Sequence, residues 1–181
     1  MLTIPNLVTL LRIALTPVVV WLLATGHYLA GGWTFGFAAF TDLVDGFLAR
    51  RFSRQSNVGL YLDPIADKIL LSSVYIGLAA VGAVERWIVV AVFARDLWIL
   101  LLSGIALRFT SFRDLQPNVW GKANTFVQIA AAVVVIAANA FFDSTLTVVG
   151  GGLMYLVAAF ALLTGVIYTL RGLQWLRKPR S

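Results

Sequence analysis

Four aspartates interrupt an otherwise apolar sequence in two pairs. Asp42 is paired with Asp45, and Asp63 with Asp67, at spacings of three and four residues. Residues so spaced share one face of an α-helix, so each pair directs two carboxylates the same way. The chain has one histidine and no cysteine, and oxygen ligands alone favour a hard cation such as Mg²⁺, with Mn²⁺ or Ca²⁺ as alternatives. Four carboxylates can hold two such ions, and two ions about 4 Å apart suit an in-line displacement at phosphorus.

Two glycines accompany these pairs. Gly46 directly follows the first pair, and Gly59 lies one helical turn before the second. Because glycine has no side chain, a bulky phosphate or nucleotide can approach the backbone closely at both positions. The acids and glycines together predict a site for phosphoryl chemistry.

The segments that carry these residues are apolar enough for a lipid bilayer. Hydrophobic residues make up 60% of the 181 residues and charged residues 12%, about half the charged share of a typical soluble domain. We therefore exclude a soluble enzyme, a coiled coil and a disordered chain, and predict an all-α, polytopic membrane protein. One domain over residues 1–181 would hold six transmembrane helices of about 20 residues each. These predicted helices span residues 7–25, 29–51, 58–84, 87–107, 120–142 and 146–173.

Basic residues predict the orientation of these helices. With six helices, nine Lys or Arg residues of the loops and ends fall on one face, and Arg86 stands alone on the other. By the positive-inside rule, the basic face with both termini is cytoplasmic. The second helix then runs toward the cytoplasm and the third returns, so both aspartate pairs reach one depth in the cytoplasmic half. The net charge of +6 fits this topology and anionic lipid head groups, and we expect no nucleic acid partner.

Aspartates inside a membrane can also serve a structural or a transport role. Such a residue can pair with an arginine to stabilise the fold, and a divalent-cation transporter or proton relay can line its pathway with carboxylates. A pathway of that kind would carry carboxylates along the full depth of the bilayer, whereas these four lie in the cytoplasmic half. The pattern therefore favours a catalytic metal site, with both alternatives left open.

Residues 42–67 read DLVDGFLARRFSRQSNVGLYLDPIAD, which is D-x2-D-G-x2-A-R-x8-G-x3-D-x3-D. This pattern resembles the signature of the CDP-alcohol phosphotransferase family. The opening IPNLVTLLRI, the DPIADK segment, Ala94-Arg95-Asp96 and Gly121-Lys122-Ala123-Asn124-Thr125 resemble the branch that makes phosphatidylglycerol phosphate or cardiolipin.

The resemblance implies a reaction and assigns residues to it. A phosphatidyl group would pass from CDP-diacylglycerol to an alcohol with release of CMP. All four aspartates would bind two Mg²⁺ or Mn²⁺ ions, and Asp67 would also act as the general base. Asn6 is among the residues assigned to the CDP moiety, and helix capping accounts for it nearly as well. The residues placed at the CDP moiety are Asn6, Thr9, Gly46, Ala49, Arg50 and Gly59.

Three further cations, Arg12, Arg95 and Lys122, would hold anionic groups of the donor or the acceptor. For Lys122, an interfacial position with the ammonium group reaching toward water is the alternative. Arg95 and Asp96 point about 100° apart on a helix, so they need not pair with each other.

Two acceptors fit the resemblance, phosphatidylglycerol and glycerol 3-phosphate. Glycerol 3-phosphate users of this family tend to carry Arg-Glu in the fourth helix and Gly-Lys-x-Lys-Thr in the fifth. This chain has Asp96 and Asn124 instead, which favours phosphatidylglycerol as acceptor and cardiolipin as product. The resemblance also implies that two copies of the chain form a homodimer, with membrane lipids around it. The absence of an Arg- and Ser-rich presequence favours a bacterial plasma membrane, with the active site facing the cytoplasm.

Overall fold

The computed structural model describes residues 4–52, 59–109 and 119–177, with most side chains between residues 9 and 41, 66 and 102, and 121 and 170. The described residues form six helices and no strand, which confirms the all-α prediction. Observed and predicted helix ends differ by about four residues at most. The helices are α1 (Ile4–Ala24), α2 (Tyr28–Phe52), α3 (Gly59–Ala80), α4 (Arg86–Phe109), α5 (Val119–Phe141) and α6 (Ser144–Arg177).

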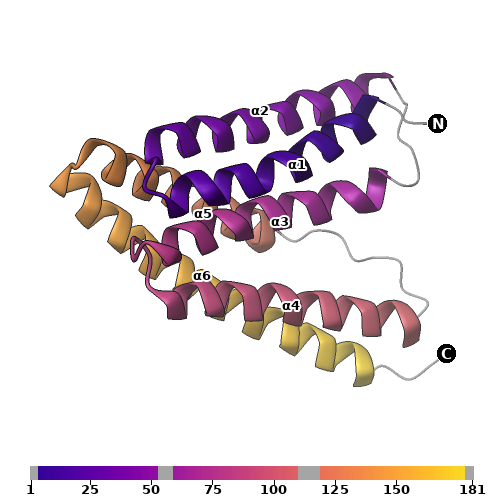
Figure 1. Ribbon diagram of the computed structural model, residues 1–181. Helices are drawn as coiled ribbons and strands as arrows, with labels where there is room; N and C mark the ends of the chain where they lie inside the picture. Colours follow the sequence, from indigo (N-terminus) through magenta and orange to yellow (C-terminus); the bar gives the residue numbers. More distant parts are fainter. Residues whose placement is uncertain (1–3, 53–58, 110–118, 178–181) are drawn as a thin grey trace.

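Successive helices run in opposite directions along one bundle (Figure 1). α1 lies between α2 and α3, α6 contacts both α4 and α5, and α5 also contacts α2 and α3. Helices α1, α3 and α5 therefore begin at the end where α2, α4 and α6 finish. We call this the motif end, because the aspartates belong to the last turns of α2 and the first turns of α3. The opposite end is the turn end.

Short turns join the helices at the turn end. Gly26 and Gly82 adopt left-handed backbone angles, with φ of 80° and 76°, where α1 and α3 finish. After Gly26, the amide of His27 donates back to the carbonyl oxygen of Leu22 at 2.8 Å. Asp143 caps α6, because its carboxylate accepts from the amide three residues further on at 2.9 Å. These turns keep consecutive helices antiparallel and in contact.

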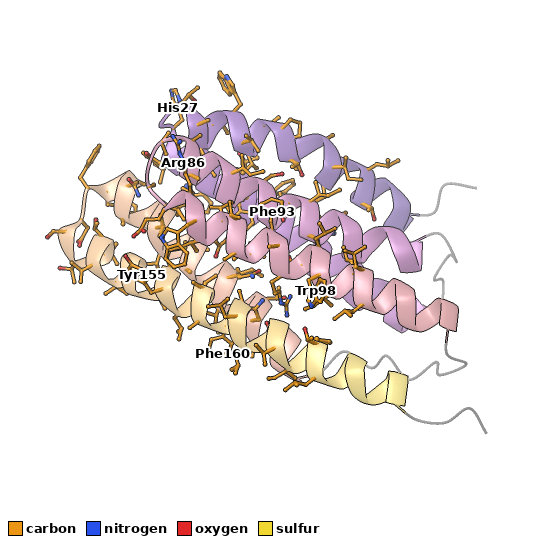
Figure 2. The ribbon with its side chains drawn as sticks, turned by 90° about the horizontal axis from the view of Figure 1, so that it is seen from below. His27, Arg86, Phe93, Trp98, Tyr155 and Phe160 are labelled. Atoms are coloured by element: carbon orange, nitrogen blue, oxygen red, sulfur yellow. The ribbon has the colours of Figure 1, made fainter. Side chains whose placement is uncertain are left out.

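Glu85 joins the turn between α3 and α4 to α6. Its carboxylate accepts hydrogen bonds from the Tyr155 hydroxyl at 2.6 Å and from the Trp87 indole (Figure 2 labels Tyr155). These two bonds, that of Tyr155 first, lower the pKa of Glu85 below its usual range. A carboxylate with a lowered pKa stabilises the fold above its ordinary pKa, and this contribution is lost as pH falls through the folded-state pKa.

Replacing Glu85 with glutamine is expected to reduce the acid sensitivity of the fold. The wild-type protein should lose melting temperature as pH falls below the usual glutamate pKa of about 4.5, because Glu85 then binds a proton and loses its ionic hydrogen bonds. The glutamine variant cannot lose that contribution. Melting temperatures in detergent, measured on both proteins between about pH 3 and pH 6, would show the difference. Parallel curves would contradict it.

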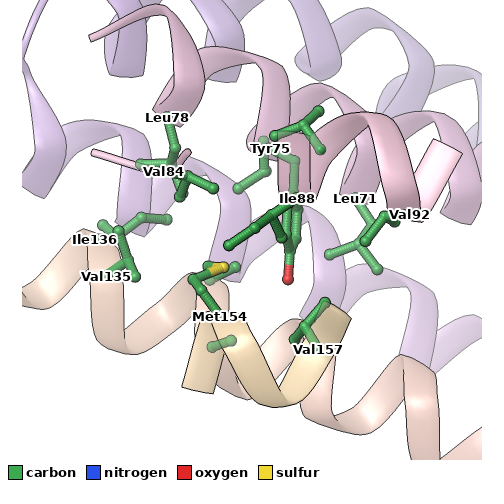
Figure 3. Packing of buried hydrophobic residues seen from close by; sticks show 14 of the residues in the cluster. Leu71, Tyr75, Leu78, Val84, Ile88, Val92, Val135, Ile136, Met154 and Val157 are labelled. Carbon is green, nitrogen blue, oxygen red and sulfur yellow. The ribbon is translucent and has the colours of Figure 1, made fainter. Parts of the chain in front are cut away.

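The interior of the bundle is divided into an apolar and a polar half. Toward the turn end the buried side chains are apolar, as Val84, Ile88, Val135, Ile136 and Met154 show in Figure 3. Toward the motif end, buried positions become polar on three helices. Polar groups inside a protein require polar partners, so the polar half of the interior is suited to binding a polar ligand. Among the side chains that the structure describes, the buried polar residues are Thr9, Arg12 and Thr16 on α1, Asn124 and Gln128 on α5, and Thr164 on α6.

The outer surface of the bundle is apolar. By length and composition, two described segments, Ala123–Phe141 and Ser144–Leu170, could cross a membrane. Every helix also exposes large apolar side chains, a surface that suits lipid better than water. Examples are Trp21, Trp33, Ile76, Leu100, Phe126 and Val148.

Candidate active site

The motif residues lie on α2 and α3, the two helices that flank α1. Asp42 and Asp45 belong to the last turns of α2, and Asp63 and Asp67 to the first turns of α3. Their side chains lie outside the described residues, so their roles as metal ligands and base stay predictions. The same holds for the predicted roles of Asn6, Gly46, Ala49, Arg50, Gly59 and Lys122.

Packing between α1 and α2 shows which residues share a level along the bundle. Gly31 of α2 lies against Leu23 of α1 so closely that an added Cβ would come within 2.7 Å of the leucine side chain. The two helices are antiparallel. Eleven residues from this contact, toward the motif end, lie Arg12 on α1 and Asp42 on α2. Because both helices rise about 1.5 Å per residue, these two positions share one level.

α3 brings the second aspartate pair to the same level. Gly77 also lies against Leu23, where an added Cβ would be 3.1 Å from the leucine Cβ. Eleven residues from Gly77 toward the motif end, α3 reaches Ala66, which is buried and directly precedes Asp67. The backbone of the Asp67 turn is therefore level with Arg12. This register agrees with the expectation that both acid pairs reach one depth.

α5 adds two buried amides near this level. Gly32 of α2 lies against Ile136 of α5. Ten residues from this contact toward the motif end, α2 reaches Asp42 and α5 reaches the turn between Asn124 and Gln128. Both amides are 0% exposed, and no described residue hydrogen-bonds to their side-chain nitrogen or oxygen atoms. Burying such groups without partners costs about 1–3 kcal/mol each. The amide nitrogens can therefore donate hydrogen bonds to a polar ligand, and the amide oxygens can accept them.

Arg12 supplies positive charge inside the bundle. Its side chain is 2% exposed, and Thr9, one turn earlier, is 1% exposed. A guanidinium in such a low-dielectric interior is stable only beside an anionic group, and its planar fork of donors suits phosphate oxygens. The hydroxyl of Thr16 donates to the Arg12 carbonyl oxygen at 2.9 Å. Both predicted residues, Thr9 and Arg12, therefore lie within the bundle near the level of the aspartates.

Arg95 belongs to a polar chain across three helices. Its Nη1 donates to Asp96 Oδ1 at 2.7 Å, and its Nε donates to Thr164 Oγ1 at 2.9 Å. Lys68 Nζ donates to the other oxygen of Asp96 at 2.8 Å. The side chains of Arg95 and Asp96 are 9% and 13% exposed, and that of Lys68 is 38% exposed. The adjacent residues Arg95 and Asp96 thus do pair, because a long arginine side chain can bend back to its neighbour.

Sequence reasoning missed Lys68, Thr164 and Gln128 as parts of this polar half. Lys68 closes the DPIADK segment, and its charge within an apolar helix was a usable signal. Gln128 is a lone amide within an apolar helix, and its amide atoms have no partner among the described residues. Thr164 carries no signal, because a threonine is common in transmembrane helices.

The donor set of the motif fits Mg²⁺. Aspartate oxygens are the ligands that Mg²⁺ prefers, and α2 and α3 bring both acid pairs to one part of the bundle. The residues that would hold the ions are Asp42, Asp45, Asp63 and Asp67. Arg12 at the same level would favour an anionic substrate beside them.

A family model described as CDP-alcohol phosphatidyltransferase matches residues 2–167. The chain belongs to the CDP-alcohol phosphatidyltransferase family. The match includes α1 to α5, most of α6 and all four aspartates. It confirms the family that the pattern of residues 42–67 predicted.

Curated relatives of this family member carry two kinds of name. The chain is 34% identical, over 93% of its length, to a probable phosphatidylglycerophosphate synthase of Mycobacterium tuberculosis, and spans 81% of that relative. It is also 34% identical, over 71% of its length, to a probable cardiolipin synthase (CMP-forming) of Drosophila melanogaster. A cardiolipin synthase (CMP-forming) of Streptomyces coelicolor is 34% identical over 69% of the chain. The chain spans 45% and 60% of these last two relatives. The names agree on a lipid synthase and differ in the product.

Proposed function

We propose that the protein transfers the phosphatidyl group of CDP-diacylglycerol to an alcohol and releases CMP. The family match over residues 2–167 carries this proposal. The register supports it, because Arg12 inside the bundle is level with Asp42 and with the turn that holds Asp67. Anionic diphosphate is the group that a buried arginine beside metal-binding aspartates would receive.

The chemistry is a single in-line displacement. The acceptor hydroxyl attacks the phosphorus on the diacylglycerol side, and a new P–O bond forms as the P–O bond to CMP breaks. Asp67 accepts the hydroxyl proton, and the leaving electron pair stays with CMP. Arg12 and Arg50 would hold diphosphate oxygens, while Gly46, Ala49 and Gly59 leave room for the nucleotide. Bound Mg²⁺ would neutralise the charge that develops on CMP.

The bundle would span the membrane six times with both termini in the cytoplasm. The alternating helices support this topology, since α1 begins and α6 finishes at the motif end. That end also carries most of the basic residues. The active site would then open to the cytoplasmic face of the plasma membrane. A homodimer is the further expectation from the family.

Phosphatidylglycerol is the acceptor that we favour, with cardiolipin as product. A glycerol 3-phosphate dianion requires several available cations. Arg95 already donates to Asp96 and Thr164, and Asn124 is a buried neutral amide where family members that use this acceptor tend to have lysine. Amides suit the hydroxyls of a glycerol head group. The 93% coverage of the mycobacterial relative supports the alternative acceptor, glycerol 3-phosphate.

One incubation distinguishes the two acceptors. Purified protein in mixed micelles receives CDP-diacylglycerol and Mg²⁺ with either phosphatidylglycerol or glycerol 3-phosphate, and mass spectrometry identifies the lipid product. We expect cardiolipin and CMP in equal amounts from the first mixture. Phosphatidylglycerol phosphate from the second mixture alone would reverse our choice. If neither mixture releases more CMP with Mg²⁺ than with EDTA, the proposed reaction is overturned.

A further inference from the structure

The carboxylate of Asp96 is the branch point of a polar chain through α3, α4 and α6. Oδ1 accepts from Arg95 and Oδ2 from Lys68, at 2.7 and 2.8 Å. Arg95 continues the chain to Thr164 on α6, whose hydroxyl in turn donates to the carbonyl oxygen of Phe160 at 2.7 Å. One anion therefore holds two cations that come from different helices.

Arg95 and Asp96 of this chain lie inside the bundle, and Lys68 reaches them from its surface. Asp96 and Arg95 are nearly buried, and the described surroundings on α3 and α4, such as Leu71 and Val92, are apolar. In such an environment an unpaired charge is costly, so each partner requires the others. The carboxylate of Asp96 is therefore held more firmly by Arg95 than it would be in an exposed ion pair, and its second oxygen is fixed to accept from Lys68.

The Lys68–Asp96 ion pair connects α3 and α4 away from the turn that joins them. The two helices are joined by the short turn at the turn end and separate toward the motif end (Figure 1). The Lys68–Asp96 pair bridges them on the motif side of the apolar core. Lys68 directly follows Asp67, so this bridge acts on the helical turn that carries the expected base.

We propose that Asp96 is a positioning residue, which holds Lys68 and with it the Asp67 turn of α3 at a fixed place relative to Arg95. The inference rests on the proposed function for its catalytic meaning. Transfer requires the base and the bound substrates to meet within fractions of an ångström, and a displacement of about 1 Å can lower a rate a hundredfold. Asp96 touches neither substrate in this scheme.

The kinetic test uses a double-mutant cycle. Asp96→Asn and Lys68→Met should each lower kcat about tenfold to a hundredfold and leave the KM for CDP-diacylglycerol within about twofold. The double variant should be no slower than the worse single variant, because both changes break one interaction. Asp96→Glu keeps the charge and should restore kcat to within about threefold of wild type.

Thr169→Val is the matched control. The Thr169 hydroxyl accepts from the Trp98 indole at 2.8 Å, and this bond also links α4 to α6, outside the Asp96 chain (Figure 2 labels Trp98). Valine has the same shape, so kcat should stay within about twofold of wild type. Additive losses in the cycle, an unaffected Lys68→Met protein, or an equal loss in the control would overturn the role of Asp96.

A distance measurement tests the tie without any turnover. The chain has no cysteine, so spin labels can be attached at Ile69→Cys on α3 and Leu97→Cys on α4, both exposed positions. The distance distribution between the labels should be narrow with Asp96 and broader or longer with Asp96→Asn. An unchanged distance distribution would show that the Lys68–Asp96 pair does not hold α3 relative to α4. If Asp96→Asn changes the distance distribution while wild-type protein transfers no phosphatidyl group, the proposed function fails and the structural role of Asp96 stands.

Discussion

Replacing Asp67 with asparagine is expected to abolish CMP release from CDP-diacylglycerol. Asparagine keeps the size of the side chain but cannot accept a proton, and it also removes one negative charge from the predicted metal ligands. Loss of general-base catalysis alone costs about a hundredfold to ten-thousandfold in rate. Purified variant with saturating Mg²⁺ and both acceptors should therefore show turnover at least about a hundredfold below wild type.

Asp143→Asn is the control for this change, because it makes the same substitution at the turn end. Asp143 caps α6, and asparagine caps a helix nearly as well. Stability and turnover should both stay near wild type. Turnover of Asp67→Asn at more than about a tenth of the wild-type rate would remove Asp67 from the mechanism and leave the site without a base.

The helices could be predicted because their signal is local. Apolar runs interrupted by Gly26 and Asp143 show where a helix finishes or begins, and the structure follows them closely. The third predicted helix continued through Gly82 to residue 84, whereas α3 finishes at Ala80, because Gly82 adopts a left-handed φ of 76°. The largest differences are at the ends. α6 continues to Arg177, beyond its predicted limit of residue 173, because arginine and leucine are good helix formers and the bilayer criterion ignores the polar turn that follows.

The shared level of the aspartates could also be predicted, since it needs only helix direction and rise. The side-chain partners could not. Whether Arg95 reaches Asp96, and whether Lys68 of α3 or another cation takes the second oxygen, depends on how α3, α4 and α6 are rotated about their axes. One sequence read helix by helix leaves those rotations undetermined. Asn124 and Gln128 show the same limit, because the burial of both amides inside the bundle follows from helix packing that no local pattern records.

Replacing Arg12 with glutamine is expected to lower transfer by at least about tenfold, mainly through weaker binding of CDP-diacylglycerol. Arg12 is buried and level with Asp42 and the Asp67 turn, where the anionic diphosphate would lie. A charge-assisted bond to a phosphate is worth about twice a neutral hydrogen bond, and glutamine retains only the neutral kind. The KM for CDP-diacylglycerol should rise more than kcat falls, which initial rates over a range of donor concentrations would show.

Arg86→Gln separates this effect from a general loss of positive charge. Arg86 is exposed at the turn end, far along the bundle from the acidic motif (Figure 2). Its removal should leave both kinetic constants within about twofold of wild type. A rise in KM for Arg12→Gln alone would place the donor diphosphate beside α1. Equal changes in the two variants would mean that the cations act on the anionic micelle surface, and that the buried guanidinium serves the fold instead.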